Sequence, residues 1–409
     1  MGSSPHTVTL PGQVWGLVAP TATGPLFSTS YDGANLRTTV VSALDLSGAL
    51  LWHREFDGHP LLPRATDTGT VWIAHYGPSG PMLTELARDG SMVREFTPEH
   101  APDEHIGVFV VLADGICVAW LSRQPSLLSP RAGHATRIAR YDASGQCLWS
   151  TPVRLDQVSY PGVVEMSADN GWQAQPKRPW TPASIKVSHW NPLLISGDRI
   201  AATFADERSG IGVTSFLDTN TGRLVAATSP GPGGHNAIVA PGEFLIGEQG
   251  YGAFRTTRYN RSGTAVQQWA SHGLLLVDQH GSIRGPEYEN VLPSRSQFRG
   301  LAEDGTLRDG PALSGYYTTY PALDSNGTAI FWRDGRLVTV DADFQMSELF
   351  TQADERAVMS RVLLLADGQV VFALHSEMLI FRNTGLGPLD DGVWPCGESN
   401  LHGNPVAYQ

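Results

Sequence analysis

Five of the 13 histidines share one place in the sequence, a short distance ahead of a glycine that ends a predicted strand. Each stands 7 to 10 residues before that glycine, and Tyr317 takes the same place further along. Imidazoles exchange protons near neutral pH and bind divalent metals. If equivalent positions of a repeat face one another, these side chains line one site. The histidines are His59, His105, His189, His235 and His272.

Other reactive side chains fall close to these positions. The segment 247–255 offers a carboxylate, a phenol and a guanidinium near His235, but its glycines do not lead from a strand into a helix, so it does not read as a nucleotide-binding loop. We predict acid–base roles for His189, His235, His272, Tyr317 and Glu248. We predict substrate contacts for His59, His105, Tyr251, Arg255, Tyr316, Trp172 and Trp180.

Three long insertions are predicted on the same side of the molecule as the histidines. Residues 154–188 read as a lid-like connection with several aromatic side chains, and 122–136 and 285–297 extend two further loops. The last of these carries Glu287, Tyr288 and Arg295. Long loops in a compact fold are often functional, because a rigid scaffold can hold reactive residues on them.

Simpler roles compete with this hypothesis. Histidine can begin a strand and bond to a neighbouring loop, tyrosine most often packs, and loops vary without purpose. Three neutral imidazoles would be enough to bind a divalent metal if the ring is narrow enough. The metal is therefore left open. The sequence holds no nucleophile elbow, P-loop, His-Glu-x-x-His or paired-cysteine motif.

A recurring turn supplies the elements that must position these residues. The clearest copies are residues 43–52, ALDLSGALLW, and 140–149, RYDASGQCLW. Asp or Asn caps such a turn through its side chain, while Gly takes the positive φ angle. The Trp four residues after the Gly is expected to fill space between neighbouring sheets. Looser copies begin at Asp218, Asn260 and Ala302.

This repeat predicts an all-β chain, a single β-propeller domain over residues 1–409 with eight four-stranded blades. Turn glycines of the inner strands recur about every 40 to 50 residues. The expected blade spans are 12–58, 59–98, 104–153, 185–231, 233–270, 271–314, 315–353 and 355–400. Seven blades would result if the first or last unit were incomplete.

The two clearest copies resemble the repeat of the PQQ-like propeller family, Ala-x-Asp-x-x-Thr-Gly-x-x-x-Trp, with Ser in place of Thr. The segment 393–404, VWPCGESNLHGN, resembles the Trp-Pro segment near a terminus of such proteins, which implies an outer strand that helps to close the ring. Quinone-dependent members use a vicinal cysteine pair and calcium. No adjacent cysteines occur here, so we expect neither PQQ nor another organic cofactor.

Composition narrows the class of partner. The net charge of −12 argues against nucleic acid and anionic membranes, and no apolar run reaches the roughly 20 residues of a membrane helix. Residues 1–11 do not read as a secretion signal, and the three cysteines are expected to be free thiols in a reducing cytoplasm. Only two lysines occur among 28 basic residues, which suggests a GC-rich, bacterial source.

Three functions fit these observations. A small-molecule enzyme, a lyase, cyclase or isomerase of bacterial specialised metabolism, would use the histidines for acid–base chemistry. A sulfuryl-transfer enzyme is the second, because bacterial arylsulfate sulfotransferases are also propellers with histidines and arginines in the funnel, and residues 234–237 are faintly similar to their histidine-bearing segments. A non-catalytic scaffold is the third, and it should show a broad exposed apolar patch. The sequence sets no oligomeric state.

Overall fold

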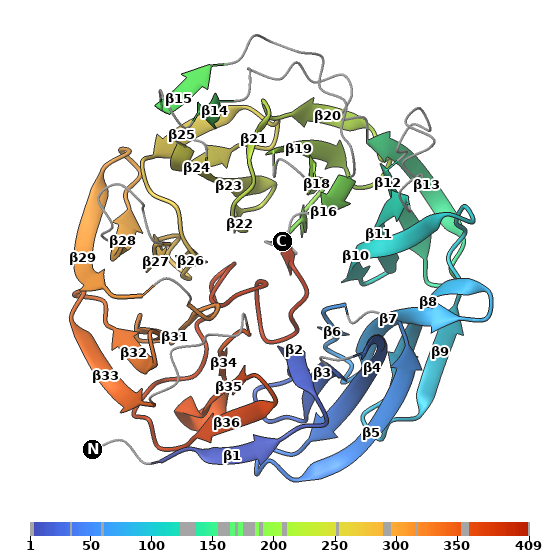
Figure 1. The fold of residues 1–409 in the computed structure, drawn as a ribbon, viewed down its shortest axis with the longest axis horizontal. Helices are drawn as coiled ribbons and strands as arrows, with labels where there is room; N and C mark the ends of the chain where they lie inside the picture. Colours follow the sequence, from blue (N-terminus) through green and yellow to red (C-terminus); the bar gives the residue numbers. More distant parts are fainter. Residues whose placement is uncertain are drawn as a thin grey trace.

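The computed structural model shows eight antiparallel sheets of four strands around a central channel, the eight-bladed propeller predicted from the repeat (Figure 1). It describes residues 4–32, 35–58, 61–122, 136–153, 164–167, 171–174, 185–187, 191–206, 211–250, 253–288, 296–315, 318–352 and 360–407. Within these ranges the only helical turn is the short 3₁₀ segment Ala366–Gly368. The seven-bladed alternative is wrong.

Blades 1 to 7 each run from an inner strand at the channel to an outer strand at the rim, in chain order. Blade 1 contains β2 (Gln13–Val18), β3 (Leu26–Asp32), β4 (Asn35–Leu44) and β5 (Leu50–Asp57). Blade 2 contains β6 (Arg64–Ala65), β7 (Val71–Gly77), β8 (Gly80–Leu86) and β9 (Met92–Phe96). Blade 3 contains β10 (Glu104–Leu112), β11 (Gly115–Ser122), β12 (Thr136–Asp142) and β13 (Cys147–Val153).

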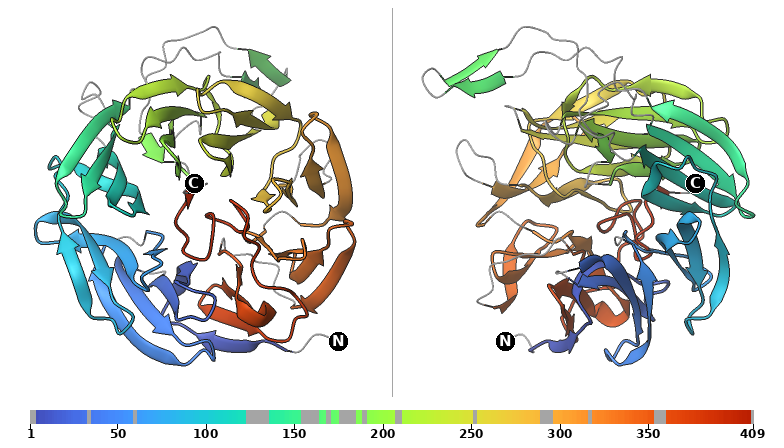
Figure 2. Two further views of the ribbon diagram at one scale, coloured as in Figure 1. Left: turned by 180° about the vertical axis from the view of Figure 1, so that it is seen from behind. Right: turned by 45° about the vertical axis from the view of Figure 1, so that its right-hand side comes forward.

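Blade 4 is larger than the others. Its main strands are β17 (Leu193–Ser196), β18 (Arg199–Asp206), β19 (Ile211–Asp218) and β20 (Leu224–Ala227). Three short strands extend it: β16 (Ile185–Val187) pairs with β18, β21 (Gly231–Pro232) with β19, and β37 (Val406–Ala407) runs parallel to β17. The hairpin β14 (Val164–Ser167) and β15 (Gly171–Ala174) forms a separate sheet, outside the ring of blades (Figure 2).

The remaining blades follow the same order. Blade 5 contains β22 (Asn236–Ala240), β23 (Glu243–Gly250), β24 (Ala253–Tyr259) and β25 (Ala265–Trp269). Blade 6 contains β26 (Leu276–Val277), β27 (Ile283–Pro286), β28 (Ser296–Leu301) and β29 (Leu307–Leu313). Blade 7 contains β30 (Ala322–Leu323), β31 (Ala329–Arg333), β32 (Arg336–Val340) and β33 (Met346–Thr351).

Blade 8 closes the ring with strands from both ends of the chain. Its inner strands are β34 (Leu363–Leu364), β35 (Val370–Leu374) and β36 (Glu377–Phe381), and its outer strand is β1 (His6–Thr9). The prediction that residues 393–404 form an outer closing strand is wrong. That segment lies in the centre of the channel, and the N-terminal strand takes the rim position (Figure 1).

The recurring turn works as its residues predict. The Asp45 carboxylate accepts hydrogen bonds from the main-chain N–H groups of Ser47 and Ala49, while Gly48 has a φ of 91°. Asp142 makes the same bonds to Ser144 and Gln146. These bonds lower the pKa of both carboxyls, led in each case by the serine hydroxyl. The side chain therefore fixes the third turn of a blade locally, as a capped hairpin.

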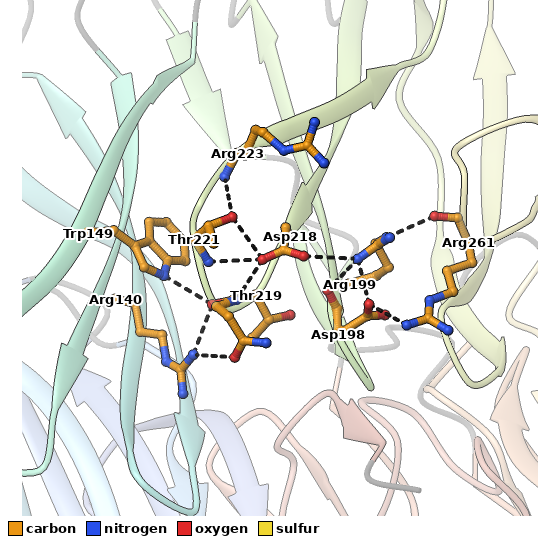
Figure 3. Close-up of polar contacts among 10 residues, drawn as sticks. Arg140, Trp149, Asp198, Arg199, Asp218, Thr219, Thr221, Arg223 and Arg261 are labelled. Atoms are coloured by element: carbon orange, nitrogen blue, oxygen red, sulfur yellow. Dashed lines mark hydrogen bonds and ion pairs between the residues drawn. The ribbon is translucent and has the colours of Figure 1, made fainter.

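Outer-strand tryptophans join blades 1, 3 and 5 to the blades that follow them. The indole N–H of Trp149 donates to the carbonyl of Thr219 in blade 4 at 3.0 Å, and its ring packs on Gly222 (Figure 3). Trp52 and Trp269 donate in the same way to Arg88 and Ala302, each in the following blade. A side chain at the turn glycine would collide with the indole. The predicted role of these tryptophans between sheets is confirmed.

Hydrogen bonds from arginine side chains reinforce the contact of blades 3, 4 and 5. Arg140 donates to the carbonyl of Thr219 at 2.9 Å, and Arg199 pairs with Asp198 at 2.8 Å and with Asp218 at 3.3 Å (Figure 3). Arg199 also donates to the carbonyl of Arg261 at 2.8 Å. The same turns thus carry both the packing and the polar contacts between blades.

The C-terminal segment after β36 crosses the channel (Figures 1 and 2). Main-chain N–H groups of inner strands donate to it in blade after blade, from Val277 to the carbonyl of Trp394, from Leu323 to that of Pro395 and from Ile195 to that of Pro405. The Asn404 amide bonds both main-chain groups of Val111. The segment therefore provides hydrogen-bond partners for main-chain groups at the channel-facing edges of these inner strands.

The cysteines are free, as expected: Cys117 and Cys396 are buried and Cys147 is half-buried. Burial raises the pKa of the Cys117 thiol to about 12. No helix in the described ranges has the length and apolar character needed to cross a membrane.

Candidate functional site

Two of the predicted histidines come together at the channel. His235 precedes β22 and His272 lies four residues before β26, in adjacent blades, and their ring centroids are 5.5 Å apart at an interplanar angle of 20°. Tyr288 stacks on His235 at 4.7 Å and 7°, and on His272 at 5.8 Å and 14°. Phe254 meets His272 edge-on at 6.0 Å. Three polar rings therefore form one stack.

Burial keeps both imidazoles neutral. His272 is fully buried, and desolvation lowers its pKa from 6.5 to about 3. Burial, followed by the proximity of His272, lowers the pKa of His235 well below its ordinary value. Neither ring nitrogen of His272 has a hydrogen-bond partner among the described residues. At neutral pH each ring therefore has one nitrogen lone pair and one N–H group.

Two glycines make room for the His272 ring. A Cβ atom on Gly247 would lie 2.6 Å from its Nδ1 and Cε1 atoms, and one on Gly234 would lie 2.6 Å from Cε1. Both glycines belong to blade 5, so the imidazole of blade 6 packs directly on the backbone of its neighbour. Gly234 and Gly247 therefore serve the close packing of this ring.

Tyr320 extends the stack across the channel. Its ring meets His235 edge-on at 5.7 Å and an angle of 80°. Burial, and then the neighbouring Tyr288, raises the pKa of its phenol well above 10, so the hydroxyl keeps its proton. A Cβ atom on Gly397 of the C-terminal segment would lie 2.2 Å from Tyr320 Cβ, so that segment touches the tyrosine directly.

Tyr320 and Arg361 occupy the repeat position of His235. Each of the three stands seven residues before the first turn glycine of its blade, and Tyr320 pairs with Arg361 in a parallel bridge. Neither residue was predicted from the sequence, because the prediction rested on histidine at this position and on Tyr317 in blade 7. A fixed count back from Gly327 and Gly368 would have found them.

A buried charge cluster lies beside Tyr320. Arg64 begins β6, Arg361 precedes β34, and both guanidinium groups are almost fully buried, at 2% and 3% exposure. Glu398 of the C-terminal segment reaches between them, with its carboxylate oxygens 3.3 Å from Arg64 Nη1 and 3.6 Å from Arg361 Nη1. Glu398 could not be found from the repeat, because it comes from outside the blades.

Glu287 holds the loop that carries Tyr288. Its carboxylate accepts a hydrogen bond from the Ser271 hydroxyl at 2.6 Å and pairs with Arg299 at 3.0 Å. Its carbonyl accepts from Arg333 at 2.6 Å. Burial raises the pKa of Glu287. Because Tyr288 N–H also donates to the carbonyl of His272, this loop fixes the phenol against the histidines.

Among the other predicted site residues, the side chains of Glu248, Arg255 and His105 are described. Glu248 and Arg255 pair with each other across β23 and β24, half-buried and exposed respectively at their side chains, which indicates a strand-to-strand ion pair. His105 lies in β10 of blade 3 and is half-buried. Only the backbone of Trp172 is described, in β15. Outside the described residues lie His59, His189, Tyr251, Tyr316, Tyr317 and Trp180.

No cluster of three or more His, Cys, Asp or Glu side chains suited to a metal occurs in the described ranges. A separate hollow of about 590 Å³ lies at the turns of blades 5, 6 and 7; Phe344, Arg284 and Arg308 help to line it, and neither His235 nor His272 does. The ring stack of His235, His272 and Tyr288 and the charge cluster are therefore the features of the described channel considered as a site.

Comparison with known proteins identifies the fold. No protein-family model matches the chain, and no curated protein matches its sequence. The solved structure of BamB from Moraxella catarrhalis superposes with a TM-score of 0.55 at 12% identity, covering 93% of this chain and all of that one. At this identity the likeness establishes fold alone.

Two weaker structural neighbours are enzymes. Virginiamycin B lyase from Staphylococcus aureus, solved as an inactive variant with quinupristin, gives a TM-score of 0.44 at 10% identity and covers 92% of this chain and 98% of that one. The periplasmic gluconolactonase of Pseudomonas aeruginosa gives 0.43 at 12%, with 87% and 98% covered. The β-propeller fold of BamB is consistent with the fold that the PQQ-like repeat implied.

Proposed function

We propose that this chain is an enzyme that moves protons on a small molecule bound at the stacked histidines of the channel. The reaction would be of lyase, cyclase or isomerase type. The observation that carries the proposal is one contact: the neutral imidazole of His235 lies against the protonated phenol of Tyr320, with His272 and Tyr288 stacked behind it. A neutral base beside a neutral acid is the pairing such reactions use.

The two groups divide the reaction between them. In an elimination, a neutral imidazole takes a proton from carbon, the electron pair of that C–H bond forms a double bond, and the leaving group departs. The phenol of Tyr320 gives its proton to the departing oxygen or nitrogen. In an isomerisation, the proton returns to a different carbon of the same molecule. Either sequence leaves the protein unchanged after proton exchange with water.

The low pKa of the imidazoles sets a condition on the substrate. An imidazole whose pKa lies well below 6.5 is unprotonated at neutral pH but accepts a proton weakly. A nearby negative charge stabilises the protonated ring and raises its pKa. An anionic substrate would therefore strengthen the base when it binds.

Deuterium uptake tests the proposal on any substrate that exchanges or loses a proton bound to carbon. The purified protein is incubated in D₂O with the small-molecule fraction of a bacterial extract, and mass spectrometry follows each compound. We expect a compound whose mass rises by deuterium, or which is consumed, with wild-type protein and with the exposed-histidine control His53→Gln. His235→Gln and Tyr320→Phe should each slow that change at least about 100-fold.

Folding of the variants is checked by circular dichroism and thermal melting. The proposal fails if folded His235→Gln and Tyr320→Phe proteins both act as fast as wild type on the compound found. It also fails if no compound changes in extracts from several organisms, including one of high GC content.

Sulfuryl transfer is the second candidate, and the buried Arg64 and Arg361 favour it, since a sulfate ester carries the charge that two guanidiniums attract. The same reaction mixture with 4-nitrophenyl sulfate and a phenol acceptor tests it. Release of 4-nitrophenol together with a new sulfated phenol would favour this reaction over proton transfer alone.

A further inference from the structure

The charge cluster in the channel has one more buried positive charge than negative. Arg64 and Arg361 each have a full charge, and Glu398 is the single carboxylate paired with them in the described part of the chain. A buried charge without a counter-charge costs several kcal/mol, so the surplus cation strongly favours an anion in its place.

Arg361 has hydrogen-bonding capacity left over. Its Nη2 donates to the carbonyl of Asn400 and to the Cys396 sulfur, the latter at 2.9 Å. Its Nε and Nη1 are buried with no hydrogen-bond partner among the described residues, because Nη1 is 3.6 Å from Glu398, too far for a hydrogen bond. Two N–H groups of one guanidinium can bind two oxygens of an anion in parallel.

The Tyr320 hydroxyl is the third donor of this group. The Tyr320 ring meets His235 edge-on, and the charges of Arg64, Arg361 and Glu398 act on the ionisation of its hydroxyl. Arg64 is held more firmly, by bonds from Nε to the carbonyl of Phe109 at 3.2 Å and from Nη1 to the carbonyl of Gly403. The unused donors therefore belong to Arg361 and Tyr320.

We propose that Arg361 and Tyr320, with the charge of Arg64 behind them, bind a singly charged oxyanion of the substrate, a carboxylate or a sulfate ester. This inference rests on the proposed function in one respect. The bound anion holds the reacting atoms of the substrate beside His235. One surplus charge matches one negative charge on the ligand. Glu398 limits the site to a monoanion, because it already neutralises the second guanidinium.

Calorimetric titration in chloride-free buffer tests the subsite with defined probes: benzoate, phenyl sulfate and the neutral isostere benzamide. We expect wild-type protein to bind benzoate or phenyl sulfate but not benzamide, and the stronger of the two distinguishes carboxylate from sulfate ester. Arg361→Met should weaken that binding at least 10-fold and Tyr320→Phe about 3- to 10-fold. Arg308→Met, which removes an arginine from the separate hollow of blades 5, 6 and 7, should leave it unchanged.

Glu398→Gln provides a test in the opposite direction. The substitution keeps the shape of the side chain but removes the competing negative charge, so anion affinity should rise at least about 10-fold. Unchanged or weaker binding in a folded Glu398→Gln protein would overturn the proposal, as would the absence of binding of both anions to wild type. This variant decides the matter even if Arg361→Met does not fold.

The binding measurement is independent of turnover. Anion binding with no deuterium uptake in any extract would contradict the acid–base function and leave the subsite standing. Deuterium uptake by a protein that binds neither anion would contradict the subsite and leave the acid–base function standing.

Discussion

The imidazole rings of His235 and His272 stay neutral at acidic pH values at which an ordinary histidine is protonated. His272 is enclosed by Phe254, Tyr288 and the backbones of Gly234 and Gly247, with no carboxylate bonded to its nitrogens in the described structure. An apolar and aromatic surrounding penalises the protonated ring. The ring is therefore available as a neutral acceptor over the whole range in which the blades are stable.

This burial predicts a dependence of stability on pH. The folded protein holds His272 unprotonated down to about pH 3, whereas an unfolded histidine takes up a proton near pH 6.5. Protons therefore favour the unfolded chain, and the contribution of His272 to stability, complete above pH 6.5, is lost as the pH falls from 6.5 toward 3. Between pH 7 and pH 4 the loss is about 3 kcal/mol.

Urea unfolding of wild-type and His272→Gln proteins at pH 7, 5 and 4 measures this effect. The free energy of unfolding should fall by roughly 3 kcal/mol less in the variant. The turn carboxyls such as Asp45 and Asp142 do not obscure the comparison, because their lowered pKa values act below pH 4 and in both proteins. An equal loss in both proteins would show that His272 is accessible to protons in the folded state.

At the scale of elements, the short inner strands depend on the segment that crosses the channel. Strands β6, β26, β30 and β34 have two residues each, and main-chain bonds to the C-terminal segment complete three of them, at Ala65, Val277 and Leu323. Leu323 lies three residues beyond Tyr320, about 10 Å further along the strand. The C-terminal segment thus holds in place the strand that follows Tyr320.

The tryptophan contacts decide how the blades pack side by side. Trp269 is almost fully buried between blades 5 and 6, and its indole donates to the carbonyl of Ala302 at 2.8 Å. Trp269→Ala should lower the free energy of unfolding by about 3 to 5 kcal/mol through the cavity left behind. Trp269→Phe should cost about 1 to 2 kcal/mol, for the lost hydrogen bond and the smaller ring.

Val266 is the matched control on the same strand, since its side chain is half exposed. Val266→Ala should change stability by less than about 0.5 kcal/mol. Denaturant unfolding followed by tryptophan fluorescence compares the three variants. A Trp269→Ala protein as stable as Val266→Ala would mean that the indole is not a structural contact between blades.

At the scale of the whole molecule, the ring is closed by the N-terminal strand. β1 covers the outer edge of β36 in blade 8 over four residue pairs, from His6 and Ile380 to Thr9 and Glu377. Leu10, just after it, is buried in the core between blades 8 and 1. Without β1, the edge of β36 would be open to pairing with another chain.

Deletion of residues 1–10 should therefore cost about 3 to 5 kcal/mol and promote association between molecules. Thermal melting and light scattering coupled to gel filtration measure the two effects. The role assigned to β1 is wrong if the shortened protein melts at the wild-type temperature and light scattering gives it the same association state as the wild-type protein.

The exposed apolar side chains bear on the scaffold hypothesis. The large ones lie near the start of outer strands around the rim, spread over several blades and away from the histidines. They are Leu50, Leu51, Met92, Val93, Leu148, Leu224, Val266 and Met346. A scaffold surface would gather such residues in one broad patch, whereas these described side chains are spread over several blades.

The sequence by itself determined the propeller, its eight blades and the turns that build them. Asp, Gly and Trp at fixed spacings act locally, since a capped turn and a strand need only a few neighbouring residues, and their recurrence reports the number of copies. The same register placed His235 and His272 at the channel. Equivalent positions of adjacent blades are close in space wherever the ring is regular.

The tertiary structure alone decided which other residues join the histidines. Tyr320 and Arg361 share the register of His235 but differ in type, so a search by residue type passed over them. Glu398 comes from a segment outside the repeat, and the outer position assigned to that segment proved to be the centre of the channel. The charged side chains there come from residues more than 300 positions apart, such as Arg64 and Glu398. A local sequence pattern cannot predict such a pairing.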